Sequence, residues 1–282
     1  MSGQLRAAVL GSPISHSLSP VLHRCAYEIL GIAATYDAIE IQENQLAQFV
    51  TKMDSSWLGV SLTMPLKEEV LKVADEVDPL ASRIQSANTL YRVGEKWRAT
   101  STDVNGFSYA LAAKSSENFT SVVILGAGAT ARCAAAAFDG KGRRITVLLR
   151  SDYRKAQMQP CVSEGELHFA QWNDRTALLD ADLIVNTTPA GVGDEVALLL
   201  DHKPDAIFFE ALYNPWPTRL LQSWRATQSR GIDGLDLLVH QAIDQIALQT
   251  EGVRKMDLPE RSTFAAALRS AGLKALGVNP QA

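Results

Sequence analysis

Residues 121–138 read SVVILGAGATARCAAAAF: a strand of β-branched residues, a glycine turn and an alanine-rich helix. Gly126 permits the tight turn, Gly128 lets the backbone approach a pyrophosphate, and Ala131 replaces the third glycine where the helix packs on the strand. The N–H groups that open the helix can hold phosphate oxygens. Because a strand and a helix flank the glycines, residues 126–131 predict a dinucleotide-binding turn.

The end of the next predicted strand, residues 145–149, indicates which dinucleotide binds. Arg150 and Arg154 can flank a 2′-phosphate and Ser151 can donate a hydrogen bond, which favours NADP because guanidinium groups match phosphate oxygens. Asp152 supports the alternative cofactor, since a carboxylate turned inward could accept a hydrogen bond from the ribose 2′-hydroxyl of NAD. A third interpretation is that these are solvated loop charges.

Short apolar runs alternate with helical patterns through most of the chain, which predicts an α/β fold. A polar stretch at 114–118 follows a helical pattern and precedes the strand of the glycine turn, which predicts a domain boundary between 100 and 120. Further strands are predicted at 5–10, 35–41, 57–62, 182–186 and 206–210. Helices are predicted from an N-cap at Ser19 to a stop at Gly31, over 235–249 and over 261–273.

The composition is that of a globular protein, with 46% hydrophobic and 21% charged residues, and its 282 residues suggest two domains. The 27 basic and 31 acidic residues give a net charge of −4, and no basic run predicts a nucleic-acid partner. Cys25, Cys133 and Cys161 lack metal-ligand spacing, so no metal is expected. Without an apolar leader or a long apolar window, we expect a cytoplasmic protein with no membrane partner.

Eight further segments accompany the glycine turn. They are GSPISHSLSP at 11–20, VSLTMPLK at 60–67, ANTL at 87–90, STD at 101–103, RSDYR at 150–154, NTTPAG at 186–191, YNPWPTRLL at 213–221, and Gly234 with Gln241. In this order and across nearly the whole chain, these segments resemble the shikimate dehydrogenase family.

The resemblance implies an enzyme with two domains. An N-terminal α/β substrate domain would span 1–104, a Rossmann-type NADP-binding domain 105–236, and C-terminal helices at 237–282 would return to complete the substrate domain. The implied reaction is the reversible, NADPH-dependent reduction of 3-dehydroshikimate to shikimate in the chorismate pathway of aromatic amino-acid biosynthesis. The partners would be small molecules, and the protein would be a monomer or a homodimer.

The resemblance also assigns roles to individual residues. Lys67 would be catalytic with Asp103 beside it, and Ser17 and Ser19 would bind the substrate carboxylate. Thr63, Asn88 and Gln241 would bind ring hydroxyls together with Asp103. The cofactor would contact Gly126, Ala127, Gly128, Ala129, Thr130, Ala131, Arg150, Ser151, Arg154, Thr187, Tyr213, Gly234 and Leu237.

The chemistry of these residue types fits the implied reaction. Hydride transfer to a ketone builds negative charge on its oxygen, which the ammonium of Lys67 can stabilise and protonate. Hydroxyls and amides can pair with each polar group of a polyhydroxylated acid. Taken alone, however, Ser17 and Ser19 suit a helix cap, Lys67 a solvated face, Asn88 a turn and Leu237 a core.

Two other functions stay open at this point. One is a quinate/shikimate dehydrogenase that uses NAD, and the other is a regulatory module that binds a dinucleotide without turnover. Lys67 and Asp103 favour the enzyme, because a regulatory module has no chemical need for the pair. Leu149 and Glu210 depart from the family, which commonly has Asn before the cofactor arginine and Asp before the tyrosine loop.

Overall fold

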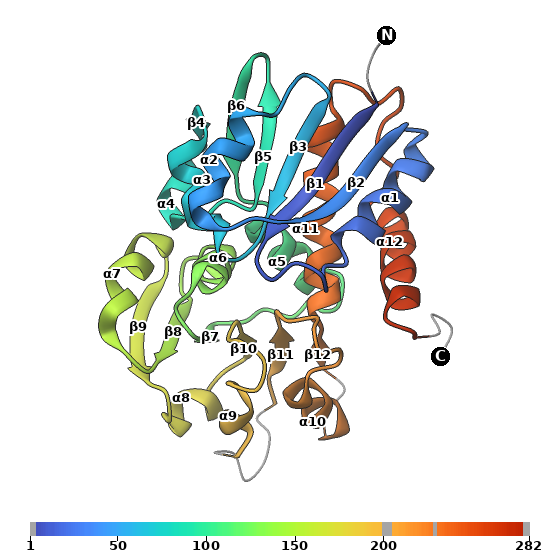
Figure 1. Cartoon of the computed structure of the whole chain (residues 1–282). Helices are drawn as coiled ribbons and strands as arrows, with labels where there is room; N and C mark the ends of the chain where they lie inside the picture. Colours follow the sequence, from blue (N-terminus) through green and yellow to red (C-terminus); the bar gives the residue numbers. More distant parts are fainter. Residues whose placement is uncertain (1–3, 199–204, 228–229, 279–282) are drawn as a thin grey trace. The chain divides into compact units, whose positions relative to one another are not determined.

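The computed structural model describes residues 4–198, 205–227 and 230–278. It consists of two compact units, one of Met1–Thr102 with Leu238–Ala282 and one of Asp103–Leu237. Each unit contains a six-stranded sheet (Figure 1). The limits expected from the sequence, 104 and 236, lie close to those of the units.

The sheet of the first unit is mixed and has the order β2-β1-β3-β5-β6-β4. Parallel pairs join β1 to β2, β1 to β3 and β4 to β6, whereas β5 is antiparallel to both β3 and β6. The strands are β1 (Leu5–Gly11), β2 (Ala34–Glu40), β3 (Trp57–Leu62), β4 (Glu76–Val77), β5 (Thr89–Val93) and β6 (Lys96–Thr100). The first three confirm predicted strands, and the β5–β6 hairpin turns through Gly94 at φ 62°.

Both faces of this sheet are buried. Along β1, Ala8 and Leu10 belong to one apolar cluster, whereas Ala7 and Val9 belong to another, as the two-residue period of a strand requires. The helices of this unit are α1 (Ser19–Leu30), α2 (Glu43–Thr51), α3 (Leu66–Val73), α4 (Pro79–Ile84), α12 (Arg261–Ala275) and most of α11 (Gly234–Thr250). Helices α1 and α12 pack side by side (Figure 1).

The start of α1 differs from the prediction. The N-cap is Leu18, which makes no side-chain cap bond, and Ser19 is the first helical residue. The cause is local. The Oγ of Ser17 accepts a hydrogen bond from the N–H of Ser19 at 3.3 Å, so Ser17, two residues upstream, pairs with a backbone N–H at the start of the helix. The predicted stop is confirmed, because Gly31 has the left-handed φ of 62°.

The sheet of the second unit is entirely parallel and has the order β12-β11-β10-β7-β8-β9. This is the doubly wound order of dinucleotide-binding sheets, with the reversal between β7 and β10, so the predicted Rossmann-type domain is confirmed. The strands are β7 (Ser121–Leu125), β8 (Arg144–Leu149), β9 (Glu166–Gln171), β10 (Leu183–Asn186), β11 (Ile207–Glu210) and β12 (Gly231–Ile232).

Helices cover both faces of the parallel sheet. On one face Phe107 of α5 packs against Phe138 of α6 and Phe209 of β11, with ring centroids 5.8 and 5.0 Å apart. On the other face Phe208 stacks on Trp224 of α10 at 4.9 Å. The helices are α5 (Asp103–Ala112), α6 (Ala129–Phe138), α7 (Lys155–Met158), α8 (Arg175–Leu179), α9 (Asp194–Leu198) and α10 (Arg219–Thr227). Two short 3₁₀ turns, at 152–154 and 159–161, flank α7.

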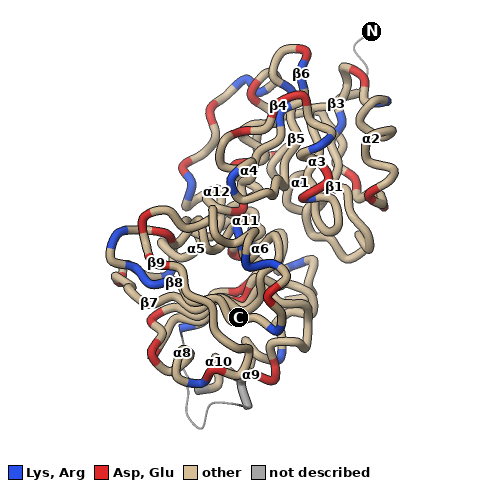
Figure 2. Tube along the Cα trace, turned by 90° about the vertical axis from the view of Figure 1, so that its left-hand side faces the viewer, with Lys and Arg blue, Asp and Glu red and all other residues tan. Residues whose placement is uncertain are grey.

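Charged side chains of both signs are interspersed along the trace of each unit (Figure 2). Many are paired, for example Arg24 with Asp37 at 2.9 Å and Lys96 with Glu76 at 2.8 Å. Among the described residues, no helix is both long and apolar enough to cross a membrane.

A buried histidine makes the first unit sensitive to acid. His23 of α1 is fully buried, stacks on Tyr36 with ring centroids 3.9 Å apart, and has its Nε2 3.3 Å from the Oε1 of Gln245. Burial lowers the pKa of His23 from 6.5 to about 3, although the Gln245 contact opposes the shift.

We therefore expect His23→Phe to flatten the pH dependence of stability. Because the folded-state pKa lies below 6.5, protonation favours the unfolded chain, and wild-type stability falls as the pH drops below 6.5. His23 accounts for up to about 1.4 kcal/mol of this loss per pH unit, and phenylalanine keeps the ring stack without the proton. Urea unfolding of both proteins between pH 7 and 5 measures the difference. Parallel curves for the two proteins would contradict this role.

Candidate functional site

Asn88 is the centre of a buried polar cluster in the first unit. Its Nδ2 donates to the Oγ1 of Thr102 at 2.9 Å and to the Oε1 of Gln241 at 3.0 Å, and its Oδ1 accepts from the N–H of Thr102 at 2.8 Å. The Nε2 of Gln241 donates to the Leu238 carbonyl at 2.8 Å. Two of the predicted substrate-binding amides, far apart in sequence, are therefore in direct contact.

The segment that carries Thr63 and Lys67 is tied to the same region by its backbone. The N–H of Leu62 donates to the Asn88 carbonyl at 2.8 Å, and the N–H of Ala87 donates to the Lys67 carbonyl at 2.9 Å. Thr63 follows β3 and Lys67 lies in the first turn of α3, both half-buried. These bonds place Thr63, Lys67 and Asn88 at one end of the sheet.

A close approach between two loops completes this end of the sheet. The N–H of Thr63 donates to the Leu10 carbonyl at 2.9 Å, and a Cβ added to Gly11 would lie 2.4 Å from the Cγ2 of Thr63. Only glycine fits there, so the loop after β1, which leads to Ser17 and Ser19, can run beside the loop after β3. Ser19 is buried and Ser17 half-buried, and neither is the N-cap of α1.

Asp103, the other predicted catalytic residue, begins α5 and belongs to the second unit. It is buried, and its Oδ2 lies 3.9 Å from the Sγ of Cys133 on α6. A thiol is a weak hydrogen-bond donor, so this contact is a weak one.

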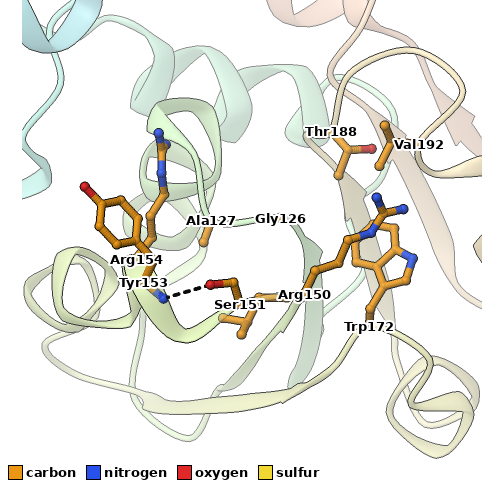
Figure 3. Close-up of a pocket in the computed structure, with 10 residues that line it drawn as sticks. Gly126, Ala127, Arg150, Ser151, Tyr153, Arg154, Trp172, Thr188 and Val192 are labelled. Carbon is orange, nitrogen blue, oxygen red and sulfur yellow. Dashed lines mark hydrogen bonds between the residues drawn. The ribbon is translucent and has the colours of Figure 1, made fainter.

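The second unit has a pocket at the carboxyl ends of its strands, where the strand order reverses (Figure 3). Its volume of about 290 Å³ suits part of a dinucleotide. The residues that line it are Gly126, Ala127, Leu149, Arg150, Ser151, Tyr153, Arg154, Trp172, Thr188 and Val192. This position is the one at which parallel α/β sheets bind nucleotides.

The glycine turn has the geometry that the sequence predicts. Gly126 has φ 94°, a conformation that favours glycine, and Gly128 is the N-cap of α6. The N–H groups of Ala129, Thr130 and Ala131 open the helix, whose axis dipole favours an anion there. Ala131 is itself fully buried.

The two arginines occupy different sides of the pocket (Figure 3). The guanidinium of Arg150 lies 4.9 Å from the Trp172 ring centroid. Arg154 lies beside the glycine turn, with its Nη1 3.6 Å from the position of a Cβ on Gly128. Ser151 lines the pocket between them, and its Oγ accepts from the N–H of Tyr153 at 3.3 Å. Asp152 is instead paired with Lys155 at 2.8 Å and is not among the pocket residues.

A buried carboxylate holds the loops after β10 and β11 together. The Nδ2 of Asn186 lies 3.1 Å from both oxygens of Glu210, which also accept from the Oγ1 of Thr218 at 2.8 Å and the N–H of Leu212 at 3.2 Å. Burial raises the pKa of Glu210, although these hydrogen bonds oppose the shift. Glu210 thereby fixes the ends of the loop that carries Tyr213.

Three predicted cofactor residues lie around these loops. The Oγ1 of Thr187 donates to the Leu125 carbonyl at 2.7 Å, which ties the loop after β10 to the glycine turn. A Cβ on Gly234 would lie 2.3 Å from the Leu212 carbonyl, so α11 begins directly against the loop of Tyr213. Leu237 is buried in the first turn of α11, near the limit of the second unit.

Known proteins are similar to this chain in sequence and in fold. The shikimate dehydrogenase substrate binding domain, as a family model, matches residues 9–90. The shikimate dehydrogenase (NADP(+)) of Thermosynechococcus vestitus is 33% identical over 86% of this chain and 88% of its own length. The chain belongs to the shikimate dehydrogenase family.

Solved members of the family have the same architecture. The shikimate dehydrogenase of Mycobacterium tuberculosis is 34% identical, with a TM-score of 0.81 over 94% of this chain and 99% of its own. The shikimate 5-dehydrogenase of Thermus thermophilus in complex with shikimate is 31% identical, with a TM-score of 0.83 over 97% and 100%. The same enzyme is also known in complex with NADP(H) and shikimate.

The family resemblance in sequence does not reveal every pocket residue. Thr188 and Val192 lie in the predicted loop after β10 but are not among the predicted cofactor residues, and the order of the parallel sheet brings them to the glycine turn. Trp172 follows β9, whose mixed burial leaves no continuous apolar run that would signal a strand. In the described part of the chain, no three His, Cys, Asp or Glu side chains gather as metal ligands.

We expect Glu210→Ala to lower the free energy of unfolding by about 3 kcal/mol or more. The substitution leaves the Asn186 amide, the Thr218 hydroxyl and the Leu212 N–H without their buried acceptor, at about 1–3 kcal/mol for each unpaired group. The matched control, Glu166→Ala, removes an exposed glutamate of β9 and should stay within about 0.5 kcal/mol of the wild type. Urea unfolding measures both. A loss below about 1 kcal/mol for Glu210→Ala would show that the loops hold without it.

Proposed function

We propose that this protein is an NADP-dependent shikimate dehydrogenase that reversibly reduces 3-dehydroshikimate to shikimate in the chorismate pathway. The observation that carries the proposal is the match to curated shikimate dehydrogenases (NADP(+)) over more than four-fifths of both chains. The contact between Asn88 and Gln241 supports it, because two converging amides suit a substrate rich in hydroxyls. The protein would act in the cytoplasm as a monomer or a homodimer.

Under this proposal the two units have separate tasks. The first unit, with α11 and α12 completing it, is the substrate domain, and the second is the cofactor domain. The residues of the second unit fit NADP: Gly126 has the required positive φ, α6 begins at the turn, and two guanidinium groups line the pocket. The bound cofactor would supply or accept the hydride.

The chain's own residues would bind the substrate and move the proton. Ser17 and Ser19 would donate to the substrate carboxylate, and Thr63, Asn88 and Gln241 would pair with ring hydroxyls. The ammonium of Lys67 would stabilise negative charge on the ketone oxygen and donate the proton that the product hydroxyl gains. Asp103 would orient Lys67 and accept a hydrogen bond from the neighbouring hydroxyl. Hydrogen bonds from Asn88 to Thr102 and Gln241 hold these side chains in fixed positions before a substrate binds.

Initial rates with shikimate and quinate, each offered with NADP and NAD, test the proposal. We expect the highest kcat/KM for shikimate with NADP. Quinate carries an additional hydroxyl on the carbon that bears the carboxylate, and a buried hydroxyl without a partner costs about 1–3 kcal/mol, or about 5- to 150-fold in kcat/KM. Equal or better use of quinate or NAD would replace the proposal with a quinate/shikimate dehydrogenase. NADP binding without any turnover would replace it with a regulatory module.

Lys67→Ala is expected to lower kcat for shikimate oxidation by about 10²–10⁴-fold with little change in KM. A general acid–base group acts mainly in the transition state, so its loss affects kcat rather than binding. Lys72→Ala is the matched control, because Lys72 lies on the same helix, is largely exposed and pairs with Glu69 at 2.6 Å. Near wild-type turnover by Lys67→Ala, or an equal loss in both variants, would exclude Lys67 as the catalytic group.

A further inference from the structure

One carboxylate stands beside the pocket of the second unit, and it has no part in the proposed function. Glu195 lies on α9, and its Oε2 lies 3.1 Å from the Nη2 of Arg150. The indole Nε1 of Trp172 donates to the same Oε2 at 3.2 Å. Arg150 and Trp172 also contact each other, with the guanidinium carbon 4.9 Å from the ring centroid.

These contacts describe a small anion site that the protein fills with its own side chain. Two donors from different loops, after β8 and after β9, converge on one oxygen atom. Both donors line the pocket, whereas Glu195 is not among the lining residues. A guanidinium and an indole N–H that bind a carboxylate oxygen can equally bind a phosphate oxygen, because both acceptors are charged oxygens with the same hydrogen-bond geometry.

We propose that Glu195 competes with the 2′-phosphate of NADP for Arg150 and Trp172, and that Trp172 is a further cofactor-binding residue. This inference rests on the proposed use of NADP. When the 2′-phosphate enters, Glu195 releases both donors, and the Trp172 N–H then donates to a phosphate oxygen. Glu195 is therefore a specificity-determining residue that keeps the affinity for NADP below what the site could reach.

The exposure of the pair makes the exchange feasible. The side chains of Arg150 and Glu195 are 54% and 65% exposed, and an ion pair so open to water holds its partners weakly. The carboxylate left behind also repels a dianionic phosphate nearby, and this repulsion persists while the phosphate is bound. NAD has no 2′-phosphate and needs no exchange, so Glu195 affects it little.

The test measures binding of adenosine 2′,5′-bisphosphate and adenosine 5′-monophosphate by titration calorimetry. Glu195→Gln should bind the bisphosphate about 3- to 10-fold more tightly than the wild type and the monophosphate within about twofold. Trp172→Phe keeps an aromatic ring beside Arg150 but loses the N–H. It should bind the bisphosphate about 3- to 10-fold more weakly and the monophosphate within about twofold. The control Glu166→Gln also removes an exposed carboxylate. Glu166 begins β9, whereas Trp172 follows the end of that strand, so this substitution should change neither affinity.

Several results would overturn the proposal. If the ratio of the two affinities is unchanged in Glu195→Gln, Glu195 does not compete with the 2′-phosphate. If Glu166→Gln shifts the ratio equally, the effect comes from the net charge of the protein and not from the position of Glu195. Weaker monophosphate binding by Glu195→Gln would make Glu195 a reader of the ribose hydroxyl instead. Unchanged bisphosphate binding by Trp172→Phe would show that Trp172 does not bind the 2′-phosphate.

The outcome is separable from that of the proposed function. The two adenosine probes need neither substrate nor turnover, so a wild type that fails to oxidise shikimate rejects the proposed function without deciding the role of Glu195. A wild type that oxidises shikimate with NADP, together with an unchanged ratio in Glu195→Gln, rejects only the role of Glu195.

Discussion

The first unit depends on the hydrogen bonds that the side-chain amide of Gln245 makes. It is almost fully buried, and its Oε1 accepts from the Oγ of Ser61 at 2.8 Å while its Nε2 donates to the Asn88 carbonyl at 3.0 Å and the Thr89 Oγ1 at 3.1 Å. A buried amide with these partners missing would cost about 1–3 kcal/mol for each group, so α11 has one favourable position over β3 and β5. The segment that follows the second unit therefore belongs to the first unit, where these bonds fix α11 against the sheet.

The same constraint shapes the candidate substrate site. Gln241 lies one turn before Gln245 on α11, so the helix that satisfies Gln245 also brings Gln241 to Asn88. Asn88 is in turn fixed by Thr102 and Thr89, which leaves its amide little freedom. A hydroxyl that binds Asn88 and Gln241 must exchange for the hydrogen bond between them, and this favours ligands whose hydroxyls match both amides at once.

The sequence predicts most of the second unit because its signals are local. The strand, glycine turn and helix at 121–138 are contiguous, and Gly126 needs the positive φ that a tight turn imposes. β4 and β12 have two residues each, and β9 is half-exposed, so none of them has a periodic pattern long enough to stand out. Gln245 has no local signal either, because a glutamine on a helix normally indicates a solvated face. Its role depends on which strands lie beneath it.

The two arginines of the cofactor pocket show that the sequence also cannot predict roles that depend on neighbours distant in the chain. From the sequence, Arg150 and Arg154 are equivalent cations near the end of one strand, and both suit a phosphate. In the structure Arg154 lies at the glycine turn, whereas Arg150 is held by Glu195 of α9 and by Trp172, which follows β9. A cation at the helix N-terminus adds attraction for any phosphate group placed there. A cation already paired with an acid adds attraction only for a ligand with a stronger anion at that spot, and so contributes to discrimination between ligands more than to affinity.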